Sequence, residues 1–387
     1  MKKTIALKLN NYLTVPHNLR EVPGLDSPVS EVAVELASLY HHYYLDSFGC
    51  RPPDPDPSKF EPTRFLLPCP EFRFQGSGLG SSTAVRRNRS TELGQAFFRW
   101  FLHEHLNVTY FAHMEQVLDR QLHRAFNSCR IERVATGDAP DYFCAESTSR
   151  VFLGEAKGRY RAVSFENKEF AQWRKQFDRV RFTDASGEAR RIKGHIVATR
   201  FATEDKPTVQ PCLYAEDPET PGTSPIDADA AAELGTVIRS AHYGQISTKL
   251  NQPILAAALT TGVPIPSELR ISAVIWEVQL GPLEGRRFVG GYFTPQGAGV
   301  HCEAGQDGRL IIRADPLRLD STPGTFFGVE EGVFRELVAA ARLDEPVLGD
   351  IGTFRQIEPF YSGFSVLRDG SALGPVDFFA AVRREVF

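Results

Sequence analysis

Cysteine is scarce in this chain of 387 residues, and its placement excludes several classes of protein. The six cysteines are scattered and never form a Cys-x-x-Cys pair, so the ligand spacing of zinc fingers is absent. Scattered thiols of this kind are typical of proteins kept in a reducing compartment. We therefore expect free, buried thiols and a cytoplasmic location.

Long hydrophobic runs are equally missing. The first apolar run, Thr4–Leu7, ends at Lys8 and is too short for a secretory signal. No later run approaches the roughly 20 residues that a membrane-spanning helix needs. The sequence therefore predicts a protein that acts away from the membrane.

The common catalytic signatures are absent too. The chain has no His-Glu-x-x-His pair, no nucleophile elbow and no dinucleotide Gly-x-Gly-x-x-Gly fingerprint. Gly76–Ser82 (GSGLGSS) superficially resembles a phosphate-cradling loop, but it lacks the lysine and the spacing of a Walker A loop. We expect a flexible connector there, with a nucleotide site as the alternative.

The net charge of −4 excludes a generally basic coat for binding nucleic acid, yet the charge is unevenly distributed. Residues 159–200 hold eleven Lys or Arg against five Asp or Glu, whereas residues 201–230 hold seven acids against Lys206 alone. A basic stretch of this kind suits a polyanionic substrate. An ordinary solvated helix face and loop is the alternative.

The most informative stretch is Pro140–Arg159, PDYFCAESTSRVFLGEAKGR. It reads as a strand that opens on Asp141, a polar turn at 147–149, and a second strand over 150–159. Because side chains alternate between the faces of a strand, Glu155 and Lys157 lie on one face. Two carboxylates and an ammonium can therefore converge, which is the composition of a metal site with a charged helper.

A Glu-x-Lys triplet alone carries little information, because a chain of this length should hold about one by chance. This chain holds three, which begin at Glu155, Glu166 and Glu204. Only the first lies in an apolar strand with a Pro-Asp pair upstream. Its surroundings, rather than the triplet, indicate a functional site.

The flanking sequence predicts a series of helices and strands around this hairpin. Ser90 or Thr91 can cap a helix, whose apolar residues recur at helical spacing. We expect a second helical run over 111–126, a strand near 131–134, a helix over 166–180 and a strand over 195–201. Together with the two strands of the hairpin, the core elements follow the order helix, strand, strand, strand, helix, strand.

The sequence resembles the PD-(D/E)xK nuclease superfamily in two respects. It has the motif residues Asp141, Glu155, Ala156 and Lys157, and it has the expected order of helices and strands around them. The resemblance implies an α/β fold with a restriction-endonuclease-like core, α-β-β-β-α-β, in which helices flank a mixed sheet. It also implies Mg²⁺, for which Mn²⁺ can substitute, held by Asp141, Glu155 and the Ala156 carbonyl. Lys157 would position the attacking water.

Further residues follow from the same resemblance. Glu92 is the candidate for an additional catalytic acid on the first core helix, although an acid favoured by the helix dipole is the alternative. A polar and basic set behind the hairpin is the candidate surface for nucleic acid. It consists of Arg159, Arg161, Gln172, Arg174, Lys175, Gln176 and Arg179.

Composition divides the chain into four parts. Residues 1–83 predict an N-terminal arm or small subdomain, residues 84–203 the nuclease-like core, and residues 204–230 an acidic, Pro-rich linker. We expect residues 231–387 to form a C-terminal α+β domain. This domain is a candidate for homodimer or protein-partner contacts.

Within residues 231–387 we expect helices over 231–242, 329–342 and 376–386. We also expect a hairpin from strands at 269–280 and 287–294, and another strand near 309–313. Apolar spacing is the basis for each.

The sequence therefore predicts a Mg²⁺-dependent endonuclease, with DNA favoured over RNA, in a restriction or anti-phage setting. One alternative is a non-catalytic nucleic-acid-binding or scaffold subunit that keeps the fold. A second is an unrelated α/β protein with a chance motif.

Overall fold

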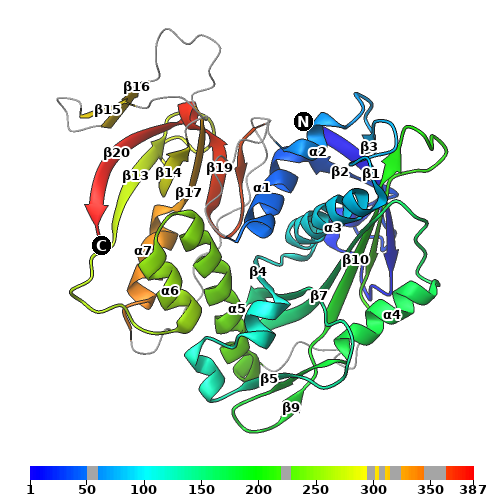
Figure 1. The fold of residues 1–387 in the computed structure, drawn as a ribbon, viewed down its shortest axis with the longest axis horizontal. Coiled ribbons are helices and arrows are strands. Elements are labelled where there is room, and N and C mark those ends of the chain that lie inside the picture. Colours follow the sequence, from blue (N-terminus) through cyan, green and yellow to red (C-terminus); the bar gives the residue numbers. More distant parts are fainter. Residues whose placement is uncertain (50–59, 219–227, 294–300, 305–309, 314–323, 344–362) are drawn as a thin grey trace. The chain divides into compact units, whose positions relative to one another are not determined.

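The computed structural model describes residues 1–49, 60–218, 228–293, 301–304, 310–313, 324–343 and 363–387. The chain forms two compact units (Figure 1). Unit 1 comprises Met1–Ser47 and Glu61–His242, and unit 2 comprises Phe48–Phe60 and Tyr243–Phe387. The boundaries that we expected at residues 83, 203 and 230 therefore do not separate compact units.

Unit 1 is built on a seven-stranded mixed sheet, in the order β2-β1-β12-β10-β7-β6-β4. The strands β7 and β10 run parallel, as do β1 and β12, and the other neighbours are antiparallel. The bounds are β1 (Lys2–Asn10), β2 (Glu31–Glu35), β4 (Tyr110–His113), β6 (Tyr142–Ser147), β7 (Arg150–Arg159), β10 (Gly194–Arg200) and β12 (Cys212–Glu216).

Helices cover both faces of this sheet (Figure 1). The helix α3 (Thr83–Leu106) lies against β7, where Gly94 meets the backbone of Gly158. The helix α4 (Lys168–Phe177) lies on the opposite face, where Phe177 packs on Gly194 of β10. Because both faces are covered, the middle of β7 and most of β10 are buried, as expected for central strands.

Smaller elements complete unit 1. The helix α1 (Leu36–Ser47) and the short α2 (Glu61–Arg64) precede α3. The strands β3 (Arg73–Phe74) and β11 (Ala202–Thr203) form a parallel pair. A separate three-stranded sheet contains β5 (Arg130–Arg133), β8 (Val180–Thr183) and β9 (Ala189–Arg190).

Several expected elements were placed wrongly. The core helix begins at Thr83, with Ser82 as its N-cap, not at residue 90. Residues 111–126 hold β4, a π-helical turn (Glu115–Asp119) and a 3-10 turn (Arg124–Asn127) instead of a helix. Tertiary packing overrides helical spacing here, because Tyr110, Phe111 and Ala112 are all buried at the edge of the sheet. The strand near 131–134 exists as β5, but it belongs to the small sheet.

Two of the four expected parts also need correction. Residues 1–83 are not a separate arm, because β1 and β2 are strands of the main sheet. The expected linker over 204–230 contains β12, whose five residues are all buried between β1 and β10. The proline-rich and acidic composition belongs to the segments that flank β12.

The contact between α3 and β7 depends on glycine. A Cβ atom on Gly158 would lie 1.7 Å from the carbonyl oxygen of Ser90 and 3.0 Å from the Cα of Gly94. Both obstacles are backbone atoms, so the helix itself would have to move. The α3 helix is thereby fixed directly against the strand that carries Glu155 and Lys157.

We expect Gly158→Ala to lower the free energy of unfolding of unit 1 by about 1–3 kcal/mol, because it overpacks this contact. Denaturant unfolding measures the change. The matched control is Gly291→Ala, since a Cβ atom there would have no heavy atom within 4 Å. Equal midpoints for the two variants would contradict the close α3–β7 contact.

Unit 2 contains an eight-stranded antiparallel sheet, in the order β15-β16-β20-β13-β14-β17-β19-β18. The bounds are β13 (Ser272–Val278), β14 (Arg287–Phe293), β15 (His301–Ala304), β16 (Leu310–Arg313), β17 (Thr325–Glu330), β18 (Ser365–Val366), β19 (Ser371–Pro375) and β20 (Phe379–Val386). The core gathers Trp276, Phe288, Phe326 and Phe379.

The helices of this region are α5 (Ala228–Lys249), α6 (Pro253–Thr261) and α7 (Glu331–Ala340). The expected α+β character and the β13–β14 hairpin are confirmed. The helix expected over 376–386 is wrong, because β20 pairs there with β13. Among the described residues, no helix has both the length and the apolar character to cross a membrane.

Candidate functional site

The β6–β7 hairpin brings Asp141 beside β7. In this antiparallel pair Tyr142 lies opposite Gly154, so Asp141 comes immediately before the first residue of β6. Its backbone carbonyl accepts a hydrogen bond from the Met114 amide at 2.9 Å. Its side-chain Oδ2 accepts one from the Ala156 amide, also at 2.9 Å. The carboxylate thus continues the hydrogen-bond ladder where the backbone pairing ends.

Lys157 joins the two acids. Its Nζ lies 3.4 Å from Oδ2 of Asp141 and forms an ion pair with Oε1 of Glu155. A single ammonium therefore spans both carboxylates. This agrees with the expectation that the three side chains converge on one face of the hairpin.

Glu155 is the most buried member of this cluster. Its side chain is 0% exposed, and apart from the ion pair with Lys157 neither carboxylate oxygen has a hydrogen-bond partner among the described residues. The pKa of Glu155 is raised to about 8, chiefly by burial and then by the neighbouring Asp141, while Lys157 opposes both effects. Burial disfavours the charged form of Lys157, but the two carboxylates outweigh it and raise the pKa of the ammonium.

The pKa of Glu155 makes the stability of the metal-free protein depend on pH. Between the ordinary value of 4.5 and about 8, the folded carboxyl holds a proton that the unfolded chain has released. The free energy of unfolding therefore falls as the pH rises through this window, by at most about 1.4 kcal/mol per pH unit from this group.

We expect Glu155→Gln to remove this pH dependence. Denaturant midpoints of the wild-type protein and the variant, compared from about pH 5 to about pH 8, measure it. The variant should gain stability relative to the wild type as the pH increases. A difference between the two proteins that stays constant with pH would contradict the burial of an ionisable carboxyl at this position.

A second buried acid lies in the same row of the sheet. The pairing aligns Glu155 with Ile196 of β10, Ile196 with Glu216 of β12, and Glu216 with Asn10 of β1. Neighbouring strands are about 4.8 Å apart, so Glu216 lies two strands from Glu155 on the same face. Sequence reasoning missed Glu216, because it lies in the segment interpreted as a linker.

Glu216 is neutralised by α4. The Arg174 guanidinium donates to both of its oxygens, at 2.8 and 2.7 Å, and the Asn10 amide donates to one of them at 2.5 Å. This bidentate pair ties α4 to the sheet. Arg174, which we expected to contact nucleic acid, is therefore paired with a buried acid, although its side chain is partly exposed.

The other residues of the expected nucleic-acid surface divide into two groups. Gln176 is buried, Arg179 donates to the Asp138 carbonyl at 2.6 Å, and Arg159 pairs with Glu169 at 2.6 Å and lies over the Trp173 ring. Burial of Gln176 corrects the expectation that all seven face a ligand, whereas the two arginines are partly exposed and make contacts within the protein. Those left exposed are Arg161, Gln172 and Lys175.

Glu92 lies away from a helix terminus. It sits in the middle of α3 and is 40% exposed. Its oxygen accepts from the Tyr43 hydroxyl at 3.2 Å and from Arg89 at 3.5 Å. The structure pairs it with these groups and not with Asp141, Glu155 or Lys157, so the reading of Glu92 as a first-turn acid was wrong.

A buried ionic cluster on the α3 side of the sheet also escaped sequence reasoning. Asp46 of α1 accepts from Arg99 of α3 at 2.9 Å and from the Tyr142 hydroxyl at 2.8 Å. His113 Nε2 lies 3.3 Å from the same carboxylate. Tyr142 adjoins Asp141 in the chain, so this cluster fixes the start of the strand that carries the candidate acid.

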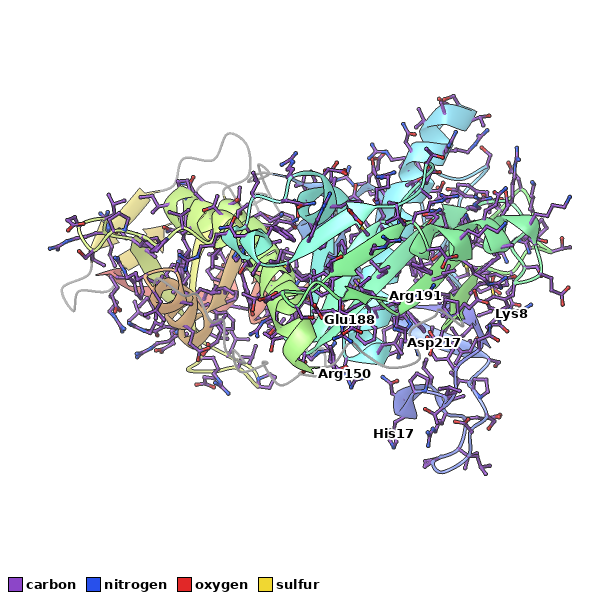
Figure 2. The ribbon with its side chains drawn as sticks, turned by 90° about the horizontal axis from the view of Figure 1, so that it is seen from below. Lys8, His17, Arg150, Glu188, Arg191 and Asp217 are labelled. Atoms are coloured by element: carbon purple, nitrogen blue, oxygen red, sulfur yellow. The ribbon has the colours of Figure 1, made fainter. Side chains whose placement is uncertain are left out.

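Another charged group lies one residue along the strands from the row of Glu155 and Glu216, because Asp217 follows Glu216 and His195 pairs with Gly154. Asp217, which follows β12, pairs with Lys193 at 2.7 Å and lies 3.7 Å from Nδ1 of His195. Figure 2 shows Asp217 in a view that also labels Arg150, the first residue of β7. Burial lowers the pKa of His195 to about 4. A neutral histidine in an ion-paired setting indicates a structural role.

The donors at the hairpin fit a divalent cation that keeps much of its water. Glu155 offers two buried oxygens, of which Oε1 pairs with Lys157, and Asp141 offers a carboxylate of the same hard type that Mg²⁺ prefers. Among the described residues, no group of three or more His, Cys, Asp and Glu side chains could enclose a metal. The protein would therefore supply two side-chain ligands.

Comparison with known proteins gave no relative: no family model, curated protein or solved structure matches this chain.

Proposed function

We propose that this protein is a metal-dependent phosphodiesterase of the PD-(D/E)xK type that acts on nucleic acid, with DNA favoured over RNA. The observation that carries the proposal is the Lys157 ammonium, which contacts both Asp141 and Glu155 at the end of the β6–β7 hairpin. Two acids can hold a divalent ion that activates water, and a lysine beside them can offset the charge that develops on a phosphodiester during hydrolysis.

The frame around the hairpin supports the proposal. The elements α3, β4, β6, β7, α4 and β10 follow one another in the order helix, strand, strand, strand, helix, strand, apart from the small sheet formed by β5, β8 and β9. The first three strands form an antiparallel meander, and β10 returns parallel to β7. This is the arrangement that a restriction-endonuclease-like core would have.

Asp141, Glu155 and the carbonyl oxygen of Ala156 would hold Mg²⁺ or Mn²⁺. When bound, such an ion lowers the pKa of a coordinated water and offsets charge on the scissile phosphate. Asp141 is oriented for this role by its hydrogen bond from the Ala156 amide. Glu155 is fixed by burial in the middle of β7.

Lys157 has two tasks in this scheme. Its side chain, which is 24% exposed, carries the positive charge of the triad and can both offset the charge of the acids and face a phosphate. It can orient the attacking water, and it opposes the negative charge that grows on the phosphate in the transition state. A fixed cation in a partly dry site does this better than solvent, because it needs no reorganisation.

The electrostatic cost of the site favours a functional role. Asp141 and Glu155 repel each other when both are ionised, which is one of the causes that raise the pKa of Glu155. Burial of Glu155 adds a desolvation penalty. Such arrangements are typical of functional sites, where chemistry compensates for lost stability.

One observation favours a second candidate function, a binding or scaffold subunit without catalysis. Lys157 already pairs with both acids, and the described residues provide no third acidic ligand. In that case nucleic acid would bind at the exposed Arg161 and Lys175, but no bond would be cleaved.

An activity panel separates the two functions. Purified protein is incubated with double-stranded DNA, single-stranded DNA and RNA, each with Mg²⁺, Mn²⁺ or EDTA. The proposal predicts cleavage that requires the divalent ion and prefers DNA. Binding without cleavage under every condition would identify the non-catalytic subunit.

The exposed cations allow a separate prediction about binding. We expect Arg161→Ala with Lys175→Ala to weaken the binding of every DNA sequence to a similar extent, because phosphate contacts carry no sequence information. The slope of log K against log salt should become shallower by nearly two, at about 0.9 per lost contact. Titrations at several salt concentrations, in a Lys157→Met background, measure the slope.

The control for this titration is Lys2→Ala with Arg270→Ala, which removes two exposed cations elsewhere in the chain. It should leave the slope unchanged. A slope that responds equally to both pairs would mean that DNA does not bind beside α4.

A further inference from the structure

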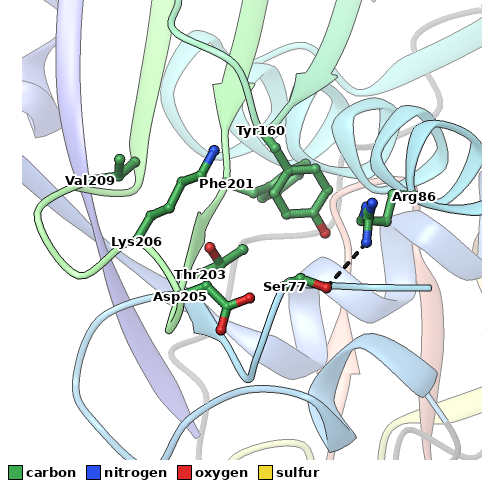
Figure 3. A pocket seen from close by; sticks show the side chains of 8 residues that line it. All are labelled: Ser77, Arg86, Tyr160, Phe201, Thr203, Asp205, Lys206 and Val209. Atoms are coloured by element: carbon green, nitrogen blue, oxygen red, sulfur yellow. Dashed lines mark hydrogen bonds between the residues drawn. The ribbon is translucent and has the colours of Figure 1, made fainter. Parts of the chain in front are cut away.

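Unit 1 contains a cavity of about 270 Å³ beyond the C-terminal ends of β7 and β10 (Figure 3). Two aromatic residues that follow these strands, Tyr160 and Phe201, lie in its wall. Arg86 of α3 and Lys206 contribute positive charges to the lining, and Asp205 contributes a negative one. None of these residues belongs to the Asp141–Glu155–Lys157 cluster.

One wall of the cavity is held rigidly. The Arg73 guanidinium donates to the carbonyl oxygens of Thr203, Lys206 and Val209 at 3.1, 3.3 and 3.0 Å. This fixes the segment that presents Asp205 and Lys206. Composition alone predicted a linker here, because the hydrogen bonds that order the segment come from β3, far away in sequence.

The glycine-rich loop forms another wall, which corrects our expectation of a flexible connector. The Gly76 amide donates to Glu204 at 2.8 Å, and its carbonyl accepts from the Asp205 amide at 3.1 Å. The Leu79 amide donates to the Tyr160 hydroxyl at 3.0 Å. Gly78 has φ +98° and a Cβ atom there would lie 2.7 Å from the Tyr160 ring, so only glycine lets the loop approach the ring this closely.

The side chains that line the cavity carry charges of both signs. In Figure 3 the Lys206 side chain extends toward the aromatic rings, and Arg86 stands beside the Tyr160 hydroxyl. The guanidinium of Arg86 donates to the Ser77 hydroxyl at 3.1 Å, which orients it. The rings of Tyr160 and Phe201 are 5.8 Å apart between centroids. The cavity therefore offers ring surface, two cations and one carboxylate acceptor.

We propose that this cavity binds a nucleotide. The base packs on the Tyr160 ring, as bases do on aromatic side chains. The phosphate lies with Arg86 and Lys206, and Asp205 accepts hydrogen bonds from N–H groups on the base edge. Guanine presents two such donors side by side, so guanine nucleotides fit best. This binding does not depend on hydrolysis at Lys157.

Calorimetric titration with GMP, guanosine and AMP tests the proposal on the full-length protein. GMP should bind, and guanosine should bind about tenfold more weakly because it lacks the charged phosphate. AMP should also bind more weakly than GMP, because its base edge offers a single amino donor to Asp205. Absence of GMP binding to the folded protein at millimolar concentration would overturn the proposal.

Variants identify the site. Lys206→Met should weaken the binding of GMP about tenfold and leave the binding of guanosine unchanged. Asp205→Asn should reduce the preference for GMP over AMP. The control Lys168→Met removes an exposed lysine that does not line the cavity. Circular dichroism confirms that each variant is folded. Equal GMP affinity in the Lys206 and Lys168 variants would overturn the assignment.

The nucleotide can be a free nucleotide or one residue of a nucleic-acid strand. A short oligonucleotide distinguishes these two cases. If the cavity holds one residue of a strand, 5′-phosphorylated dGpT should bind more tightly than dGMP. If it holds a free nucleotide, dGMP should bind at least as tightly. Repeating the titration with the Lys157→Met protein keeps this test separate from the nuclease proposal, because the affinity should not change.

Discussion

Replacing Lys157 by methionine is expected to lower the rate of divalent-dependent cleavage by about 10²–10³-fold or more, because it removes a fixed charge from the transition state. Glu155→Gln should have at least as large an effect, since it removes a charged ligand while keeping the shape of the side chain. Both proteins should remain folded, because glutamine has the shape of glutamate and methionine replaces most of the lysine stem; circular dichroism checks this.

The sequence provides a matched control for these two variants. Glu166 and Lys168 form a second Glu-x-Lys triplet, and both residues are exposed. Glu166→Gln and Lys168→Met should therefore keep full activity. Cleavage by Glu155→Gln at the wild-type rate would show that any nuclease activity resides elsewhere in the chain.

Loss of the Asp46 carboxylate is expected to have the largest effect on stability. The Asp46 and Arg99 side chains are 2% and 1% exposed, so Asp46→Ala leaves a guanidinium buried without its ion-pair partner. Removal of one member of a buried pair typically costs about 3–5 kcal/mol. The Tyr142 hydroxyl loses its acceptor at the same time.

Denaturant unfolding monitored by fluorescence measures this change. Glu61→Ala is the control, because Glu61 also pairs with an arginine, Arg89, at 2.6 Å, but on the surface. An exposed pair contributes about 0–1 kcal/mol. Similar midpoints for Asp46→Ala and Glu61→Ala would mean that the Asp46–Arg99 pair is not buried in solution.

The β6–β7 hairpin could be predicted from the sequence because its information is local. The alternation of side chains along 150–159 places Glu155 and Lys157 on one face, and Pro140 marks the start of the partner strand. On the other face of β7 the side chains next to Gly158 are small, because α3 packs closely there. The α4 helix and β10 were predictable for the same reason, with bounds that differ by a few residues.

The rest depended on partners that are distant in sequence. Whether 212–216 is a strand is decided by β1, more than 200 residues earlier, which pairs with it. Its composition is otherwise dominated by the prolines and acids that flank it. Burial on both faces likewise made β4 resemble a helix in its apolar spacing. The Asp46–Arg99 pair and the Arg174–Glu216 pair arise only when helices dock.

The central claim is that Asp141 and Glu155 form a metal centre, and a titration with Mn²⁺ followed by electron paramagnetic resonance tests it without any assumption about the substrate. The account predicts that the wild-type protein binds Mn²⁺, that Mg²⁺ competes, and that Glu155→Gln loses this binding while Glu166→Gln keeps it. A wild-type protein that binds no Mn²⁺, or a Glu155→Gln variant that binds it unchanged, would contradict the account.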